Sequence, residues 1–205
     1  MPRNKELSDA MREQSRAAIL AAARQLFAER GYFNCKVSDV AKAAKMSKGN
    51  VYWHFASKEL LLQAVLANGF DSLGQIMIDA ANSPGSSQDK LRTLVQAYID
   101  FGQGGSQFLS IYMSLLGHGG AELMARLGFD LRQIGLGYHQ SLLQILSLAK
   151  VEGVLTTDTD LQMLTMFFFS FFNGLILTYG TEWTQLPMGE IETAVSRLCG
   201  FTTPI

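Results

Sequence analysis

Residues 47–55 constrain this chain more than any other segment, because their order fits a short helix with two different sides. Ser47 has a side chain suited to an N-cap, and each following residue turns the helix by about 100°. Val51 and Phe55 then lie four positions apart and pack inward on one side. The segment therefore predicts a short helix held to the rest of the chain by two apolar side chains.

The opposite side of this predicted helix carries an unusual mixture of residues for a surface. A glycine, an amide and an indole face outward, from Gly49, Asn50 and Trp53. Donor groups border them on either side, from Lys48, Tyr52 and His54. A plain solvated helix would leave two large aromatic rings exposed without purpose. We interpret the segment as a recognition helix that enters a groove lined with phosphates.

Charge is distributed unevenly along the chain, although the whole sequence has a formal charge of only −1. Residues 1–60 contain eleven Lys and Arg against six Asp and Glu, whereas residues 61–205 contain six against twelve. The first segment thus carries a net charge of +5 and the second a net charge of −6. This asymmetry indicates a polyanion partner for the N-terminal head and none for the body.

The composition favours a soluble, cytoplasmic protein with a real core, because 48% of its 205 residues are hydrophobic. Cys35 and Cys199 are too few and too far apart for a disulfide framework. The polar N-terminus does not resemble a signal peptide. The three histidines are isolated, and no Ser/His/Asp arrangement, phosphate-binding glycine loop or metal-ligand spacing is found. We therefore expect no enzymatic activity, no metal and no cofactor.

Helical spacing of apolar residues predicts an all-α fold, with a three-helix helix-turn-helix head and a helical C-terminal body. The first helix of the head is expected at residues 10–30, with Gly31 just after its end. Ser57 is expected to cap a fourth helix that reaches about residue 81. Further helices are expected at residues 89–101, 106–116, 121–150, 159–182 and 189–200. We set the domain boundary between residues 1–56 and residues 57–205.

Residues 161–180 contain no charged side chain and are long enough to cross a bilayer. Polar residues interrupt the segment, acidic residues flank it, and no Lys or Arg lies close to its ends. A helix that is apolar all round is more often buried in a core or an interface. We therefore expect no membrane contact, and keep a protein anchored by residues 161–180 as an alternative.

Three segments of the N-terminal third together resemble the tetracycline-repressor (TetR) family of bacterial transcription factors. They are AARQLFAERGY at residues 22–32, VSDVA at residues 37–41 and SKGNVYWHFASK at residues 47–58. The last run is especially similar to the drug-sensing repressors of that family. The resemblance covers about residues 15–66. It implies a homodimer with a DNA-binding head, a small-molecule pocket in the body, and a dimer interface built from the last two long helices.

The chain departs from the family pattern at two positions. The family usually has Thr or Ser at the start of the second helix, where this chain has Cys35 and Lys36, so Ser38 or Asn34 is expected to act as the cap. The family usually has Gly in the turn before the recognition helix, where this chain has Lys45. A left-handed Lys45 would cost about 1 kcal/mol.

The resemblance places the recognition helix in the major groove of operator DNA. Lys48, Tyr52, His54 and Lys58 are then expected to contact phosphates, which positions the helix without reading sequence. Gly49 allows close approach, and the Asn50 amide suits the edge of an adenine. Trp53 would contact a thymine methyl group or the sugar-phosphate wall. Ser47 belongs to this DNA-binding set as the helix cap, and Ser38 is either a cap or a phosphate contact.

The body is rich in Phe and Met, with a few polar groups among them, as small-molecule pockets usually are. We expect an apolar or aromatic effector with contacts drawn from Tyr112, Met113, Phe129, Arg132, Phe168, Phe172 and Asn173. Small residues four apart on the most apolar helix favour close helix packing, and place Ser170, Gly174 and Leu177 in the dimer interface. The sequence thus predicts a regulator, most simply a repressor that its effector releases from DNA. A ligand-independent DNA-binding factor with the same head remains a further alternative.

Overall fold

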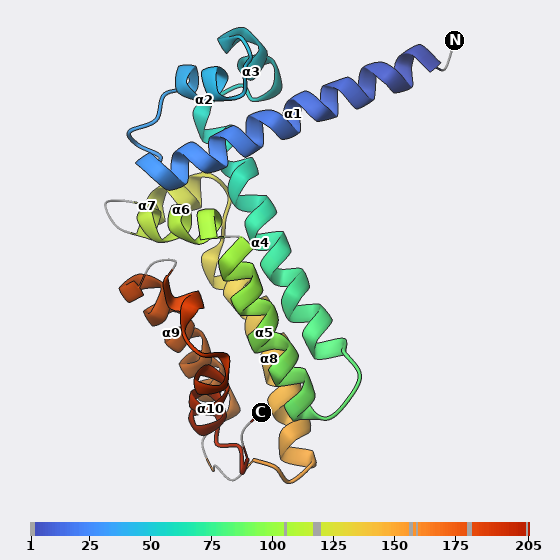
Figure 1. Ribbon diagram of the computed structural model, residues 1–205, viewed down its shortest axis with the longest axis vertical. Helices are drawn as coiled ribbons and strands as arrows, with labels where there is room; N and C mark the ends of the chain where they lie inside the picture. The colour runs from blue at the N-terminus through green and yellow to red at the C-terminus, as the bar shows by residue number, and fades with distance from the viewer. Residues whose placement is uncertain are drawn as a thin grey trace. The chain divides into compact units, whose positions relative to one another are not determined.

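The computed structural model describes residues 3–104, 106–116, 120–155, 158, 160–179, 182–203 and 205. All regular elements in these ranges are helices, and two residues outside them form one isolated bridge, Leu155 with Phe201. The α-helices follow one another along the chain (Figure 1), as α1 Arg3–Arg30, α2 Val37–Ala43, α3 Lys48–His54, α4 Lys58–Asn82, α5 Ser87–Gly104, α6 Ser106–Leu116, α7 Gly120–Arg126, α8 Leu131–Val151, α9 Leu161–Tyr179 and α10 Met188–Cys199. A short 3₁₀ helix, η1 (Glu182–Gln185), precedes α10. The predicted all-α fold is confirmed.

The chain separates into two compact units. Unit 1 comprises residues 1–69 and 107–128, and unit 2 comprises residues 70–106 and 129–205. The first unit holds the predicted head together with the start of α4, most of α6 and all of α7. It is therefore larger than residues 1–56, and the boundary that we set there stays a prediction.

The start of α2 differs from the two caps expected from the sequence. Lys36 occupies the N-cap position, and its backbone N–H donates to Asp39 Oδ2 at 2.9 Å. The Cys35 thiol is buried and donates to the carbonyl of Leu26 at 3.2 Å, so it ties the loop to α1 instead of capping α2. The cap roles expected of Ser38 and Asn34 are wrong: Ser38 lies inside α2, and the Asn34 amide donates to Arg30 at the end of α1.

The turns after α1 and before α3, and the caps of α3 and α4, lie where the sequence places them. Gly31 ends α1 with a φ of +77°, and Lys45 adopts a φ of +57° in the turn between α2 and α3. Lys45 is therefore left-handed, the case for which a cost of about 1 kcal/mol applies. Ser47 and Ser57 cap α3 and α4 through bonds of 3.1 Å from the N–H groups of Asn50 and Leu60. These caps fix where the recognition helix begins and where the next helix starts.

The single helix predicted at residues 121–150 is wrong, because the chain breaks between α7 and α8. Gly128 has a φ of +82°, which ends α7, and Asp130 Oδ1 accepts the N–H of Gln133 at 3.0 Å to begin α8. Gly135 and Gly137 both lie within α8. The break therefore arises from one left-handed glycine and an aspartate cap.

The core of unit 2 is built from α5, α8, α9, η1 and α10, which pack against one another. Trp183 of η1 is almost fully buried and meets the rings of Tyr98 and Phe172 at centroid distances of 6.4 and 5.8 Å. The start of α5 is capped from far along the chain, since the Ser87 N–H and hydroxyl donate to Glu152 Oε2 at 3.0 and 2.5 Å. These contacts join the two chain segments that make up unit 2.

Helix α9 is the one helix within the described ranges that is long and apolar enough to cross a membrane. Length and composition alone support this, and the core helices of soluble proteins pass the same test. Its inward residues are buried, namely Leu164, Thr165, Phe168, Phe172 and Ile176. Only 28% of its most apolar window is buried within this chain, so much of its surface faces away from the core.

Candidate nucleic-acid interface

Helix α3 is held in unit 1 by the two apolar residues expected from the sequence. Val51 and Phe55 are both buried. Outward, Trp53 leaves 67% of its surface exposed and Tyr52 leaves 43%. Lys48, Gly49 and Asn50 are exposed as well. The predicted two-sided helix is therefore present, with an indole, an amide and a bare backbone on one open face.

The absence of a side chain at Gly49 is not required by the fold. A Cβ atom built there would meet only Ser47 Oγ, at 3.7 Å, which is an ordinary contact. Glycine within a helix is less favourable than alanine by about 1 kcal/mol. The chain thus keeps a costly residue where its own packing leaves room for a larger one. A partner that approaches the backbone closely would explain this choice.

Two basic side chains of this region lie against aromatic rings. The Lys48 ammonium is 5.7 Å from the centroid of the Tyr52 ring, and the Lys58 ammonium is 4.1 Å from that of Tyr32. Burial lowers the pKa of Lys58 from its ordinary value of 10.5. Such contacts hold a flexible side chain in fewer conformations, which reduces the entropy lost when it binds an anion.

His54 is half-buried beside the Trp53 indole, with ring centroids 4.6 Å apart. Burial, and then the positive charges of Arg12 and Arg16, lower the pKa of His54 below its ordinary value of 6.5. Its imidazole is therefore neutral at pH 7 and offers one N–H donor, as a phosphate contact requires. Ser38 is exposed on α2. With its cap role excluded, a phosphate contact is the remaining prediction for Ser38.

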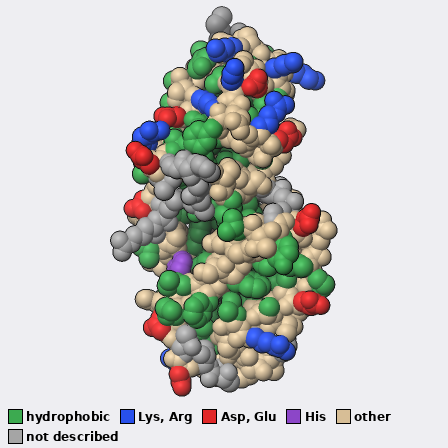
Figure 2. All heavy atoms as spheres, turned by 90° about the vertical axis from the view of Figure 1, so that its left-hand side faces the viewer, with side chains coloured by type: hydrophobic (Ala, Val, Ile, Leu, Met, Phe, Trp, Pro, Cys, Tyr) green, Lys and Arg blue, Asp and Glu red, His purple; other side chains and the backbone are tan. Residues whose placement is uncertain are grey.

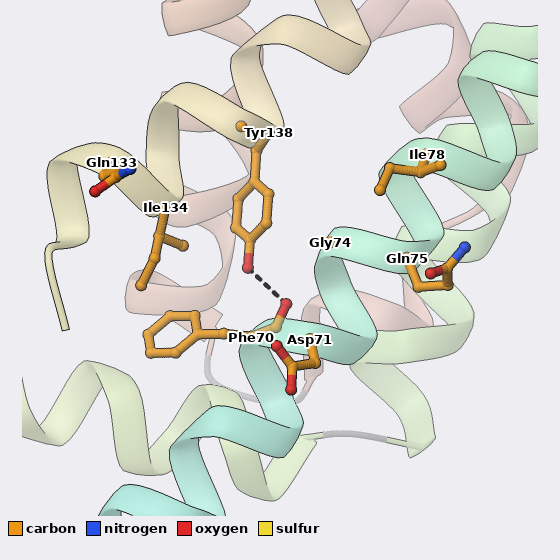
Figure 3. A pocket seen from close by; sticks show the side chains of 9 residues that line it. Phe70, Asp71, Gly74, Gln75, Ile78, Gln133, Ile134 and Tyr138 are labelled. Atoms are coloured by element: carbon orange, nitrogen blue, oxygen red, sulfur yellow. Dashed lines mark hydrogen bonds between the residues drawn. The ribbon is translucent and has the colours of Figure 1, made fainter. Parts of the chain in front are cut away.

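A groove of about 480 Å³ lies in unit 2 between α4 and α8. Its walls are Phe70, Asp71, Gly74, Gln75 and Ile78 on one side and Gln133, Ile134, Gly137 and Tyr138 on the other (Figure 3). The Tyr138 hydroxyl donates to the Phe70 carbonyl at 2.8 Å. A Cβ atom on Gly74 would lie 3.4 Å from the Tyr138 ring, within ordinary contact. The groove was not predicted from the sequence, where its local signal is the small residues Gly74 and Gly137.

The seven residues expected to bind the effector fall in different places, and the groove is lined by none of them. Tyr112 and Met113 belong to unit 1 and are half-buried. In unit 2, Phe168 and Phe172 are fully buried, Asn173 is exposed, and the Phe129 ring packs 5.2 Å from that of Phe70 at the groove. The side chain of Arg132 lies outside the described part of the structure. These effector contacts remain predictions.

An exposed apolar stripe follows α9 at helical spacing. Met163, Met166, Phe167 and Leu177 all expose large apolar side chains, and 75% of Leu177 is exposed. Ser170 and Gly174 are also exposed on this stripe, and a Cβ atom on Gly174 would meet nothing within 4 Å. Figure 2 shows hydrophobic side chains gathered on the face that includes this helix. The three residues predicted for the dimer interface thus lie on one open face of the helix.

Within the described ranges, no group of three or more His, Cys, Asp and Glu side chains is placed to hold a metal ion. The Cys199 thiol is buried, and this burial raises its pKa to about 12. Burial likewise raises the pKa of Cys35. Both thiols are therefore protonated at neutral pH and are poor nucleophiles.

Comparisons with known proteins agree with this geometry. The family model described as bacterial regulatory proteins of the tetR family matches residues 19–65, which include α2, α3 and the start of α4. The transcriptional activator FasR of Mycolicibacterium smegmatis is 34% identical over 96 residues, which cover 47% of this chain and 44% of FasR. The regulator SrpR of Pseudomonas putida is 26% identical over 183 residues, which cover 78% of this chain and 84% of SrpR.

Solved structures show that the fold extends over nearly the whole chain. The ketosteroid transcriptional regulator KstR2 of Mycobacterium tuberculosis superposes with a TM-score of 0.73 at 22% identity, over 92% of this chain and 95% of that one. FadR from Bacillus subtilis in complex with stearoyl-CoA gives a TM-score of 0.71 at 20% identity, over 90% and 97%. The fold and the exposed α3 face define a helix-turn-helix transcriptional regulator. Residues 19–65 of this chain match the TetR family of bacterial regulatory proteins, and the fold of the whole chain is that of the solved regulators.

Proposed function

We propose that this protein is a cytoplasmic, homodimeric repressor that an apolar or aromatic small molecule releases from operator DNA. The observation that carries the proposal is the outward face of α3. There Gly49, Asn50 and Trp53 are exposed, although the fold does not require a glycine at residue 49. Asn50 reads a base edge, whereas Lys48, Tyr52, His54 and Lys58 bind phosphates. Trp53 contacts a thymine methyl group or the groove wall.

The dimer is proposed to form through the stripe on α9, with Ser170, Gly174 and Leu177 at its centre. Large apolar side chains flank these small residues, so a second copy of α9 approaches closely at the middle and buries apolar surface on either side. Two-fold symmetry then presents two copies of α3. Helix-turn-helix dimers bind half-sites about 34–36 Å apart along the duplex, in successive turns of the major groove.

Release from DNA is proposed as a shift between two conformations of the dimer. The effector prefers a conformation in which the two copies of α3 are wrongly spaced, and its differential affinity sets the size of the shift. The groove between α4 and α8 is one candidate site, because apolar walls and a few amide and carboxylate groups converge there. Helix α4 carries Lys58 at its start and the groove residues Phe70, Gly74 and Ile78 further along. Repacking along α4 would therefore move Lys58.

The proposed function is tested by selecting duplexes from a random-sequence pool with the purified protein. We expect a two-fold symmetric site, with half-sites about 10–10.5 base pairs apart. A thermal-shift screen of hydrophobic aromatics and fatty acids then seeks effectors, since a ligand of the folded state raises its stability. A pool that yields no enriched sequence would contradict a sequence-specific regulator. Stabilisation only by sugars or metal ions would contradict an apolar effector.

Two alternatives are separated by the same material. A protein anchored by residues 161–180 would sediment with membranes and require detergent, because the stripe on α9 would face lipid. The proposed dimer stays in solution without detergent and scatters light as two chains. A ligand-independent DNA-binding factor would bind the selected duplex with an affinity that no compound in the screen changes.

A further inference from the structure

The N-terminal part of α1 packs little against the rest of unit 1. Burial is described from residue 8 onward, where each residue from 8 to 18 is exposed or half-buried and Ile19 is the first buried one. The family model also begins at residue 19. A polar helical segment with so little packing gains little stability from tertiary contacts. The fold therefore does not explain why this extension is present.

Two arginines of the extension lie against aromatic rings at α3. The Arg12 guanidinium lies 5.2 Å from the centroid of the exposed Trp53 ring, and the Arg16 guanidinium lies 5.5 Å from that of Phe55. The two arginines are four residues apart, so they share one side of α1. The extension is thus tied to the recognition helix through side chains and not through a packed core.

Two acidic residues lie near the arginines of the extension. At about 100° per residue, Asp9 and Glu13 lie roughly 60° and 100° away from Arg12 around the helix. Glu13 approaches Arg16, with 3.6 Å between Oε1 and Nη1, and both acids are exposed. Glu13 thus partners Arg16, whereas Arg12 contacts Trp53. The positive charge of both arginines reaches His54 and lowers its pKa, while the smaller effect of Glu13 raises it.

We propose that this extension is a second DNA-contacting element, in which Arg12 binds a phosphate beside the groove that α3 enters. The proposal rests on the DNA-binding function proposed above. The flat face of a guanidinium stacks on the indole of Trp53, while its edge keeps N–H donors for phosphate oxygens. The stack holds both side chains in place before DNA arrives. The proposed DNA-contacting surface thereby extends from α3 onto α1, and both helices contribute basic side chains to it.

The test compares Arg12→Ala, Arg12→Lys and the control Arg24→Ala on the duplex selected by the wild-type protein. Arg24 is an exposed arginine of the same helix, about 120° around it from Arg12. The salt slope is the steepness with which the logarithm of the binding constant falls as the logarithm of the salt concentration rises. Removal of one phosphate contact lowers this slope by about 0.9. Salt rises fourfold from 50 to 200 mM, and a slope lower by about 0.9 over this range corresponds to a factor of about 3.5 in affinity. Arg12→Ala should therefore lose about 3.5-fold less affinity than the wild type. Arg12→Lys should keep the wild-type slope, and so should Arg24→Ala.

A double-mutant cycle with Trp53→Leu measures the stack itself. If the stack orients both groups, the effects of Arg12→Ala and Trp53→Leu on the dissociation constant are not additive. Circular dichroism and melting temperature confirm that the variants fold, as expected for residues outside the core. An unchanged salt slope for Arg12→Ala on a duplex that the wild type selects overturns this inference and leaves the proposed function standing. Failure of the wild type to select any duplex overturns both.

Discussion

The ammonium group of Lys58 lies 4.1 Å from the centre of the Tyr32 ring, at the first residue of α4. Tyr32 is buried and follows the end of α1, so the ring joins the two helices that flank α2 and α3. Its burial raises the pKa of its hydroxyl, which stays protonated at neutral pH. A neutral ring against a cation is a stable support for a lysine that we propose to bind phosphate.

Replacement of Lys58 with alanine should weaken binding to selected and random duplexes alike. Phosphate contacts carry no sequence information, so the ratio of the two affinities should stay constant. The salt slope should fall by about one unit. Fluorescence anisotropy over a series of salt concentrations measures both quantities. A wild-type slope for Lys58→Ala would remove this residue from the interface.

Replacement of Gly49 with alanine should separate folding from binding. The structure has room for the added methyl group, and alanine favours the helix by up to about 1 kcal/mol, so the free energy of unfolding should rise. Affinity for the selected duplex should nevertheless fall, because the backbone can no longer approach as closely. Gly135→Ala, in the open middle of α8, is the control that should gain stability without losing affinity. Unchanged DNA affinity in Gly49→Ala would show that no close approach occurs there.

The head was predictable because its signals are local. Ser47 and Ser57 each cap the helix that follows them, and a four-residue spacing buries Val51 and Phe55. Such features depend on a few neighbouring residues, and the sequence contains them in full. The departure at Lys45 was also visible locally, although only the structure shows that this residue is left-handed.

Features that depend on distant residues were not predictable in this way. The cap of α5 comes from Glu152, 65 residues away, and the Arg12 contact with Trp53 joins α1 to α3. Apolar aromatic residues give no sign of whether they fill the core or line a pocket. Phe168 and Phe172 are buried against other rings, while the groove lies between α4 and α8. The spacing of apolar residues shows which side of a helix faces inward, but not which residues that side contacts.

Replacement of Gly174 with leucine should convert the dimer to a monomer. The space around Gly174 within one chain is open, so the larger side chain should not disturb the fold. It should instead obstruct a partner helix at the centre of the α9 stripe, where small residues permit close packing. Light scattering should show one chain, and affinity for the two-fold symmetric duplex should drop. An intact dimer would exclude Gly174 from the interface.

Acidification should destabilise the protein partly through His139. Its Nδ1 lies 2.9 Å from Thr165 Oγ1, whose own hydroxyl donates to the Gln162 carbonyl at 2.7 Å. The histidine nitrogen is therefore the donor to Thr165. Burial lowers the pKa of His139 below 6.5, so the unfolded chain binds the proton more readily than the folded one. This contribution to stability is full above pH 6.5 and is lost as the pH falls through the lowered pKa.

The measurement for His139 is the difference in unfolding free energy between the wild type and His139→Gln, from pH 8 to pH 5. Glutamine has no charge to gain, so only the wild type loses stability through this position. The advantage of the wild type should shrink as the pH falls. A difference that stays constant over this range would mean that His139 has the same pKa in the folded and unfolded chains.

The central claim is that the exposed face of α3 reads a DNA sequence, and the Asn50 amide tests it most directly. Wild-type protein and Asn50→Ala are titrated against the selected duplex and against duplexes that carry each single base-pair change. We predict that Asn50→Ala loses roughly 1–3 kcal/mol of discrimination at one base pair and keeps its affinity for random duplex. Equal discrimination by the two proteins at each position would contradict base reading by Asn50. A wild-type protein that binds all these duplexes equally would contradict the account as a whole.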